Sequence, residues 1–211
     1  MENAFQTVLA EYHQRVAAEA KLRDNISRED HLKQRDNFLL QIGEGPATIL
    51  NTLVKEKGAK VIVEVGTSYG YSTLWFAEAA RATGGKVITL DLHAYKQEYA
   101  RAALERAGLA RYVEFKTGDA RESLAALSGP FDFVLLDLWK DLYIPCFDLI
   151  YPKLAPNALI AADNMTSPAF FHKDAEEYRK YVRGKADIQS MLLPIGSGIE
   201  LSRCTRGVEF I

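Results

Sequence analysis

The sequence has little of several features that would mark particular classes of protein. Only two of its 211 residues are cysteines, and Cys146 and Cys204 lie far apart and outside any C-x-x-C pattern. This spacing indicates neither a disulfide framework nor a zinc-binding motif, and it favours a reducing compartment. No run of apolar residues is long enough to cross a membrane, and the first residues lack the pattern of a secretory signal. We therefore expect a cytoplasmic protein without a membrane-spanning segment.

A strong charge of one sign is also absent. Lys and Arg number 26 and Asp and Glu number 28, so the net charge is −2. Such a balance creates no field that would gather nucleic acid or anionic lipid, and we expect neither as a partner. With 48% hydrophobic and 26% charged residues the chain can bury a sizeable core, and its length is that of one domain. We expect residues 1–211 to form a single domain.

The first 40 residues differ in pattern from the rest of the chain. Apolar residues at spacings of three and four predict an amphipathic helix near the start: Phe5, Val8, Leu9, Tyr12 and Val16. The polar segment 21–37 that follows is either a solvated helix or a mobile flap. We therefore assign residues 1–40 to a helical cap or lid. Residues 41–211 are assigned to the core, which opens with a helix over 44–57.

Short apolar runs alternate with helical segments after Gly58. The predicted strands are Val61–Val65, Lys86–Leu90, Tyr112–Lys116, Phe131–Leu136 and Leu159–Ala162. The predicted helices are Ser72–Thr83, Tyr95–Gly108, Arg121–Leu127 and Asp141–Leu154, followed by an exposed helix over 173–185. Two further strands, Gln189–Ile195 and Ile199–Arg203, flank a tight turn. This alternation predicts a Rossmann-like, doubly wound α/β fold with a mostly parallel seven-stranded sheet, helices on both faces and an antiparallel C-terminal strand.

Three consecutive strand ends carry residues suited to a nucleoside ligand. Gly66 and Gly70 allow a sharp turn close to a ligand, although G-x-x-x-G is not the dinucleotide fingerprint G-x-G-x-x-G. Asp91 ends the second strand, where a carboxylate can accept both hydroxyls of a ribose. Gly118 and Asp119 follow the third strand. Ordinary turns and a helix cap at Asp91 are the alternatives, but the coincidence of three such ends favours nucleoside binding.

The fourth and fifth predicted strands end in acidic and amide side chains. If these strands are neighbours, Asp137, Asp163 and Asn164 bring three oxygen ligands together, a set that suits a hard octahedral cation such as Mg²⁺. The alternative is that both acids cap helices and Asn164 belongs to a turn. Lys140 lies one helical turn after Asp137. A partly desolvated lysine there is a candidate general base, and otherwise it is a surface lysine.

Together these motifs resemble those of the class I S-adenosylmethionine-dependent methyltransferases. The run Leu136-Asp137-Leu138-Trp139-Lys140-Asp141 with Asp163-Asn164 resembles the catechol O-methyltransferase and caffeoyl-CoA O-methyltransferase branch. The resemblance implies metal ligands at Asp137, Asp163 and Asn164 and a catalytic base at Lys140. It implies cofactor contacts at Ile42, Gly43, Glu64, Gly66, Ser68, Tyr71, Ser72, Asp91, Leu92, Gly118, Asp119, Ala120, Asp137 and Trp139. It implies substrate contacts at Trp139, Lys140, Asn164, Pro168 and Glu200.

The same resemblance implies an enzyme with a defined reaction. It would transfer a methyl group from S-adenosylmethionine to one hydroxyl of a catechol-like small molecule, with Mg²⁺ or another divalent cation such as Mn²⁺ or Ca²⁺. The resemblance leaves a homodimer open. One alternative acceptor is a modified nucleoside in RNA. A nucleotide-binding oxidoreductase is a second alternative and would need a glycine where Ser68 stands; a non-catalytic binding module would leave Lys140 idle.

Overall fold

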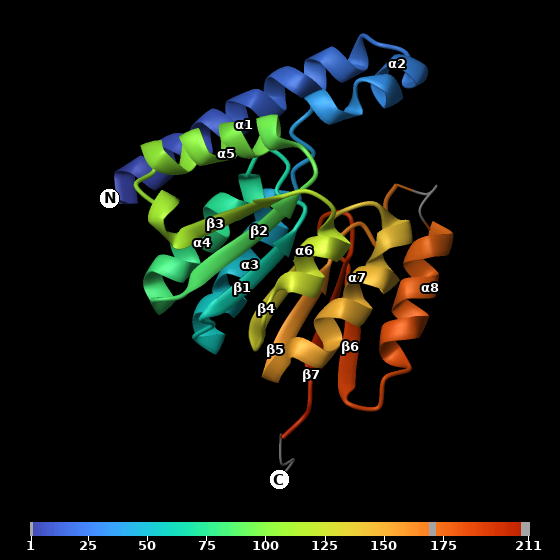
Figure 1. Ribbon diagram of the computed structural model, residues 1–211. Helices are drawn as coiled ribbons and strands as arrows, with labels where there is room; N and C mark the ends of the chain where they lie inside the picture. The colour runs from blue at the N-terminus through green and yellow to red at the C-terminus, as the bar shows by residue number, and fades with distance from the viewer. Residues whose placement is uncertain (1, 169–171, 208–211) are drawn as a thin grey trace.

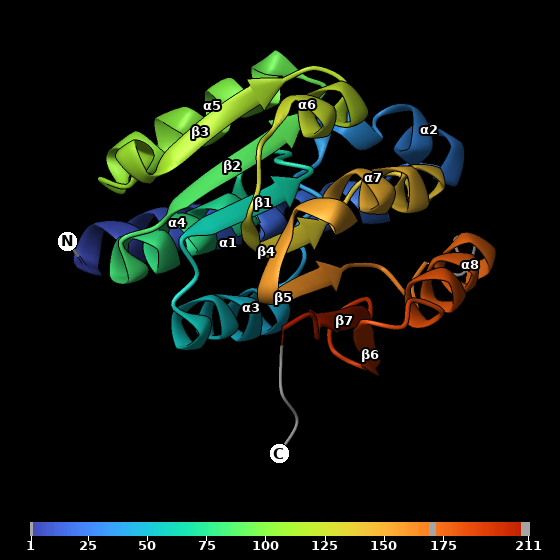
Figure 2. The same cartoon turned by 60° about the horizontal axis from the view of Figure 1, so that its bottom comes forward.

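The computed structural model describes residues 2–168 and 172–207. These residues contain a seven-stranded sheet with the order β3-β2-β1-β4-β5-β7-β6, which Figure 2 shows as a continuous twisted succession. The strands from β1 to β5 are parallel, and β7 is antiparallel to both of its neighbours. The predicted fold class is therefore confirmed. The strands are β1 (Val61–Val65), β2 (Lys86–Asp91), β3 (Val113–Thr117), β4 (Phe131–Leu136), β5 (Leu154–Ala162), β6 (Ile188–Leu193) and β7 (Ile199–Cys204).

Helices cover both faces of the sheet (Figure 1). On one face pack α1 (Glu2–Asp24), α3 (Glu44–Lys57), α4 (Tyr71–Thr83) and α5 (Ala94–Arg106). On the other pack α6 (Ala120–Ala126), α7 (Tyr143–Ile150) and α8 (His172–Arg183). Shorter elements connect them: α2 (Arg28–Lys33) and the 3-10 turns η1 (Arg35–Asn37), η2 (Ala110–Tyr112), η3 (Lys140–Leu142) and η4 (Tyr151–Lys153).

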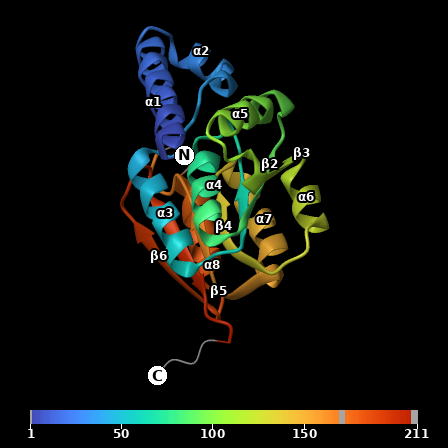
Figure 3. The ribbon, with the colours of Figure 1, turned by 90° about the vertical axis from the view of Figure 1, so that its left-hand side faces the viewer.

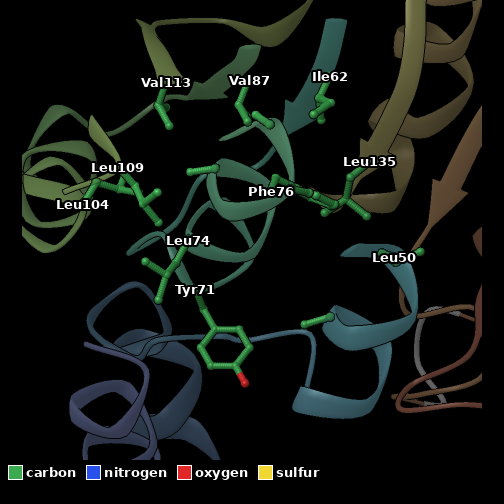
Figure 4. Close-up of a cluster of buried hydrophobic side chains, with 14 of the residues drawn as sticks. Leu50, Ile62, Tyr71, Leu74, Phe76, Val87, Leu104, Leu109, Val113 and Leu135 are labelled. Atoms are coloured by element: carbon green, nitrogen blue, oxygen red, sulfur yellow. The ribbon is translucent and has the colours of Figure 1, made fainter. Parts of the chain in front are cut away.

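The two faces follow from the side-chain alternation within each central strand. In β1, Ile62 joins the core on the α4 side, whereas the next residue, Val63, joins the core on the α7 side. In β4, Leu135 belongs to the core on the α4 side and Val134 to the core on the α7 side. Residues on both sides of these strands are apolar because helices cover both faces of the sheet, and the exceptions are Glu64 in β1 and Asp132 in β4. Figure 4 shows Phe76 of α4 pointing toward Leu135 within the first of these cores.

Some predicted boundaries differ from the observed ones. The helix predicted over 141–154 is shorter, because α7 is flanked by the 3-10 turns η3 and η4, and Pro152 in η4 has no N–H to continue an α-helix. The strand predicted over 159–162 begins earlier, at Leu154, and its pairing with β4 shifts in register between Phe131 and Phe133. Asn157, in this irregular part, has a positive φ of 61°. The irregularity hides the strand's first half from a search for regular alternation.

The N-terminal region lies beyond the carboxyl ends of the parallel strands, at the top of Figures 1 and 3. The helix α1 extends through the beginning of the segment that we expected to be a flap or solvated helix. The hydroxyl of Tyr12 in α1 donates a hydrogen bond of 2.6 Å to the carbonyl of Tyr69 in the loop after β1. None of the described helices is long and apolar enough to span a membrane.

Candidate active site

A cavity of about 540 Å³ lies at the carboxyl ends of the parallel strands, where the strand order changes direction between β1 and β4. Open α/β sheets bind ligands at this position. Eleven of the predicted site residues line it: Gly66, Ser68, Asp91, Leu92, Gly118, Asp119, Ala120, Asp137, Trp139, Asn164 and Pro168. The topology thus gathers residues from five strand ends that are far apart in the sequence.

Gly66 is required by the close approach of two of these strand ends. Its φ is 113°, and a Cβ at this position would lie 1.9 Å from the carbonyl oxygen of Asp137. The backbone N–H of Asp137 in turn donates a hydrogen bond of 2.9 Å to the carbonyl of Val65. Only a residue without a side chain allows the loop after β1 to pass against the end of β4.

Asp91 lines the cavity with a carboxylate that two backbone N–H groups hold in place. Its Oδ2 accepts a hydrogen bond of 2.7 Å from the backbone N–H of Ser68, and its Oδ1 accepts one of 2.9 Å from the N–H of His93. The residue at the N-cap of α5 is His93, so the alternative in which Asp91 is simply that helix cap is not observed. Each carboxylate oxygen of Asp91 can accept a further hydrogen bond besides the one from the backbone.

Asp119 combines a cavity position with a structural role. It is the N-cap of α6 and accepts a hydrogen bond of 2.7 Å from the backbone N–H of Arg121. The Arg121 guanidinium binds the same carboxylate at 2.6 Å, and this pair lowers the pKa of Asp119 to about 2. The acid after β3 is therefore ionised across the physiological pH range.

The predicted metal ligands meet at the ends of β4 and β5, which are neighbours in the sheet. The backbone N–H of Asp163 donates to the carbonyl of Leu136 at 3.0 Å, and the Asn164 amide donates to Oδ2 of Asp163 at 3.1 Å. Burial raises the pKa of Asp137, and burial and the neighbouring Asp137 raise that of Asp163. The other oxygen of Asp163, Oδ1, is buried and accepts no hydrogen bond from the described residues.

A buried carboxylate oxygen without a partner is costly unless a cation satisfies it. Among residues 2–168 and 172–207, no group of three or more His, Cys, Asp and Glu side chains is placed to hold a metal ion. The candidate set is instead two carboxylates, Asp137 and Asp163, with the amide oxygen of Asn164. Three hard oxygen donors with one orphaned oxygen fit Mg²⁺ or Ca²⁺ chemistry better than zinc.

Lys140 is buried beside these acids, so the alternative of a surface lysine is wrong. Lys140 is the first residue of η3, and only 4% of its surface is exposed. The ammonium donates to Oη of Tyr143 at 2.5 Å, to the carbonyl of Leu138 at 3.2 Å and to Oδ1 of Asn164 at 3.2 Å. Burial lowers the pKa of Lys140, although the neighbouring acids oppose this effect. Burial therefore makes the neutral amine of Lys140 more accessible than that of an exposed lysine.

Tyr143 is a site residue that sequence reasoning did not identify. It is fully buried, and its Oη lies 2.9 Å from the carbonyl of Leu136 and 3.2 Å from that of Asp163. These acceptors fix the hydroxyl that receives the hydrogen bond from Lys140. The available signal was its place three residues after Lys140, because a helical turn brings such side chains together.

Several predicted cofactor contacts lie behind the cavity wall. Glu64 is fully buried, and its Oε2 accepts hydrogen bonds of 2.6 Å from the hydroxyls of Thr73 and Thr89, whereas Oε1 has no partner in the described chain. Burial raises the pKa of Glu64 to about 7, against the opposing effect of the neighbouring hydroxyls. Ser72 is also buried, at the start of α4.

Three further predicted cofactor contacts also lie outside the cavity lining. Tyr71 is buried, and its hydroxyl forms a hydrogen bond of 3.1 Å with a ring nitrogen of His13. Ile42 is buried and Gly43 is the N-cap of α3, directly after the lining residue Gln41. Ile42 and Gly43 thus follow a lining residue in the sequence, but none of the three residues lines the cavity.

Glu200, for which the resemblance implies a contact with a substrate hydroxyl, does not line the cavity in this structure. Glu200 lies within β7 opposite Ala162 and is fully buried. Its two carboxylate oxygens accept hydrogen bonds of 2.7 and 2.9 Å from the Arg183 guanidinium of α8. The side chain is therefore held in a salt bridge between β7 and α8 and does not line the cavity.

The N-terminal region contributes cavity residues that no sequence motif marks. They include Glu19, Arg23, Arg35, Asp36, Leu40 and Gln41. Glu19 accepts hydrogen bonds from the Arg15 guanidinium at 2.6 Å and from the backbone N–H of Leu39 at 2.8 Å. Asp36 binds the ammonium of Lys96 at 2.7 Å. Helical spacing predicted α1, but only the folded chain shows that these polar residues face a ligand cavity.

The fold and the site define an α/β protein with a cavity at the carboxyl ends of its parallel strands, beside a cluster of buried acids and a buried lysine. A family model described as O-methyltransferase matches residues 15–205, which is most of the chain. The chain belongs to this family of class I S-adenosylmethionine-dependent enzymes. This membership removes the alternative of a nucleotide-binding oxidoreductase.

Individual relatives support the same branch. The chain is 34% identical over 130 residues to a catechol O-methyltransferase from Niastella koreensis, covering 60% of this chain and 58% of that protein. It is 30% identical over 175 residues to caffeoyl-CoA O-methyltransferase 1 from Zea mays, covering 73% and 67% respectively. The solved O-methyltransferase from Bacillus cereus in complex with SAH is 26% identical, with a TM-score of 0.75 and coverage of 94% and 90%.

Proposed function

We propose that the protein transfers the methyl group of S-adenosylmethionine to one hydroxyl of a catechol-type small molecule, in a reaction that depends on a divalent cation. The observation that carries this proposal is the orphaned Oδ1 of Asp163 next to Asp137, Asn164 and the buried Lys140. Relatives named catechol O-methyltransferase and caffeoyl-CoA O-methyltransferase support the choice of acceptor.

The loops after β1, β2 and β3 would bind the cofactor. The two oxygens of Asp91 suit the two hydroxyls of a ribose, since each already accepts a backbone N–H that fixes the carboxylate. Gly66 lets the ligand approach the backbone closely.

Asp137, Asp163 and Asn164 would hold Mg²⁺ or a similar cation through oxygen atoms. When bound, such a cation supplies Lewis-acid chemistry that lowers the pKa of a coordinated hydroxyl. Lys140 would accept the hydroxyl proton, since burial lowers its pKa to about 8 and makes its neutral amine more accessible than that of an exposed lysine. The acceptor oxygen forms a bond to the methyl carbon as the carbon–sulfur bond breaks. Orientation of the two reactants supplies up to roughly 7–11 kcal/mol of the acceleration.

Trp139 and Pro168 would form the walls beside the acceptor ring. Both line the cavity, and Trp139 is 53% exposed although it is an aromatic residue next to the catalytic lysine. An exposed indole at a cavity mouth offers a flat apolar surface to an aromatic ligand. The net charge of −2 gives no support to an RNA acceptor. A homodimer remains a prediction of the family resemblance.

The test is mass spectrometry of a panel of catechols incubated with the protein and S-adenosylmethionine, with Mg²⁺ in one arm and a chelator in the other. We expect one added methyl group only in the Mg²⁺ arm. The variant Asp163→Asn should abolish this product, whereas the control Asp141→Asn, at an exposed residue of η3, should not. Product formed equally with chelator contradicts the metal site, and the absence of product from every catechol contradicts the acceptor.

A further inference from the structure

Gln97 of α5 joins three neighbouring strands near the end of the sheet where the cavity lies. The residue is 3% exposed. Its amide nitrogen Nε2 donates to the hydroxyl of Thr67, in the loop after β1, at 3.1 Å. The same nitrogen lies 3.4 Å from the carbonyl oxygen of Thr89 in β2 and 3.1 Å from that of Lys116 in β3. Its amide oxygen Oε1 accepts a hydrogen bond of 2.7 Å from the hydroxyl of Thr117, the last residue of β3. One amide therefore links segments that belong to three strands.

The direction of the hydrogen bonds around Gln97 follows from one buried acid. The hydroxyl of Thr89 donates to Oε2 of Glu64 at 2.6 Å, which uses its only proton. The hydroxyl of Thr67, 2.6 Å from that of Thr89, must therefore be the donor between the two. The oxygen of Thr67 then accepts the N–H of Gln97. These four residues form one directed chain of buried hydrogen bonds, and bonds arranged in series polarise and strengthen one another.

The segments that Gln97 joins lead directly into the cavity wall. Thr67 stands next to the lining residue Ser68, and Thr117 directly precedes the lining residue Gly118. Neither Gln97 nor Thr117 lines the cavity. Any effect of these two side chains on a bound ligand therefore acts through the spacing of the loops after β1 and β3.

We propose that Gln97 is a positioning residue for the nucleoside part of the cofactor. It fixes the loop after β1 relative to the loop after β3, and Thr117 fixes the orientation of its amide. This inference rests on the cofactor loops of the proposed function, but it needs neither the metal site nor a particular acceptor. A ligand that contacts two loops binds more tightly when the protein already holds them at the required spacing, because less of the binding free energy is lost in ordering them.

The test measures the binding of SAH and of 5′-methylthioadenosine, which share the nucleoside, by calorimetry at a temperature where circular dichroism shows each variant folded. Gln97→Met keeps the length of the side chain and removes its hydrogen-bonding atoms. We expect this variant to weaken both ligands by the same factor, about tenfold. The matched control is Gln6→Met, at an exposed glutamine of α1 outside the cavity lining, which should bind both ligands like the wild type.

Thr117 allows a second test at an exposed position, where a substitution has little effect on stability. Thr117→Val removes the hydroxyl that holds the Gln97 amide and should weaken SAH about fivefold, whereas Thr117→Ser retains the hydroxyl and should stay within about twofold. Because Thr117 acts through Gln97, the two losses should not add. The double variant Gln97→Met/Thr117→Val should therefore bind SAH as Gln97→Met does.

Three results would overturn the proposal: unchanged affinity of Gln97→Met for SAH, a loss confined to SAH, or losses that add in the double variant. If Gln97→Met does not fold, the Thr117 variants decide, and equal affinities of Thr117→Val and Thr117→Ser for SAH would refute the role of Gln97. None of these measurements needs turnover. A failure to methylate every catechol would therefore contradict the proposed function and leave the test of Gln97 unaffected.

Discussion

The backbone N–H of Ser68 donates a hydrogen bond of 2.7 Å to Oδ2 of Asp91, which joins the loop after β1 to the end of β2. The hydroxyl of Ser68 donates in the other direction, to the carbonyl of Leu39 at 3.0 Å. The N–H of Leu39 donates to Glu19 of α1 at 2.8 Å. One chain of hydrogen bonds therefore links the N-terminal helix to the acid that suits a ribose, and the cap and the cofactor loops form one network.

Glu19→Ala should weaken cofactor binding although Glu19 lies far in sequence from Asp91. The substitution leaves the buried N–H of Leu39 without its acceptor, at a cost of about 1–3 kcal/mol. We expect a lower melting temperature and several-fold weaker binding of SAH by calorimetry. Glu19→Gln retains an amide oxygen as acceptor and should lose less. The control Glu11→Ala, at an exposed residue of the same helix, should bind SAH like the wild type.

Lys140→Ala should lower kcat by about 10²–10⁴-fold, the usual contribution of a positioned general base. The affinity for SAH should stay within twofold, because Lys140 contacts Tyr143 and Asn164 and does not line the cofactor cavity. Single-turnover kinetics and calorimetry measure the two quantities separately. Lys180→Ala, on the exposed face of α8, serves as the control. An equal loss of turnover and of SAH affinity would refute the role as base.

Asp163→Asn should change stability and metal affinity in opposite directions. Without a cation, burial and the nearby Asp137 disfavour the ionised Asp163, so a neutral amide of the same shape should raise the melting temperature of the metal-free protein. The same substitution removes a charged ligand and should weaken Mn²⁺ binding at least tenfold. Thermal melts with a chelator and Mn²⁺ titration calorimetry test both directions. A lower melting temperature together with unchanged Mn²⁺ affinity would contradict the assignment of Asp163.

Glu64 should make the ligand-free protein less stable as the pH rises. Burial raises its folded pKa to about 7 from an ordinary value of 4.5, so between these values the folded state binds more protons than the unfolded state. The stability contribution is complete below about pH 4.5 and is lost as the pH rises to about 7. Glu64→Gln should remove this pH-dependent contribution to the free energy of unfolding, which amounts to at most about 3 kcal/mol.

Urea unfolding at a series of pH values gives the free energy of unfolding of the wild type and of Glu64→Gln. The difference between the two plots against pH is the contribution of Glu64. Glu98→Gln, on the exposed side of α5, controls for the loss of one negative charge. The opposite sign, a wild type that gains stability relative to Glu64→Gln between pH 4.5 and 7, would show that a protein cation compensates this carboxylate.

Much of the site was predictable because it lies in short segments directly after strands. The glycine turn at Gly66, the acid at Asp91 and the run from Asp137 to Lys140 each combine a local backbone requirement with a chemical group, so sequence position alone locates them. The burial of Glu200 was not predicted, because no sequence pattern marks Arg183 as its salt-bridge partner. Tyr143 was missed because its function lies in a contact with Lys140 rather than in a motif.

The sequence by itself determined the order of strands and helices, since apolar runs and helical spacing are properties of neighbouring residues. It also determined which chemical groups stand at each strand end. Only the tertiary structure decided that β4 and β5 are neighbours, which brings Asp137 to Asp163, and that Lys140 is buried among them. It alone placed Glu19 and Arg35 on the cavity wall. Burial, charge compensation and the meeting of distant segments arise from packing, which no local pattern encodes.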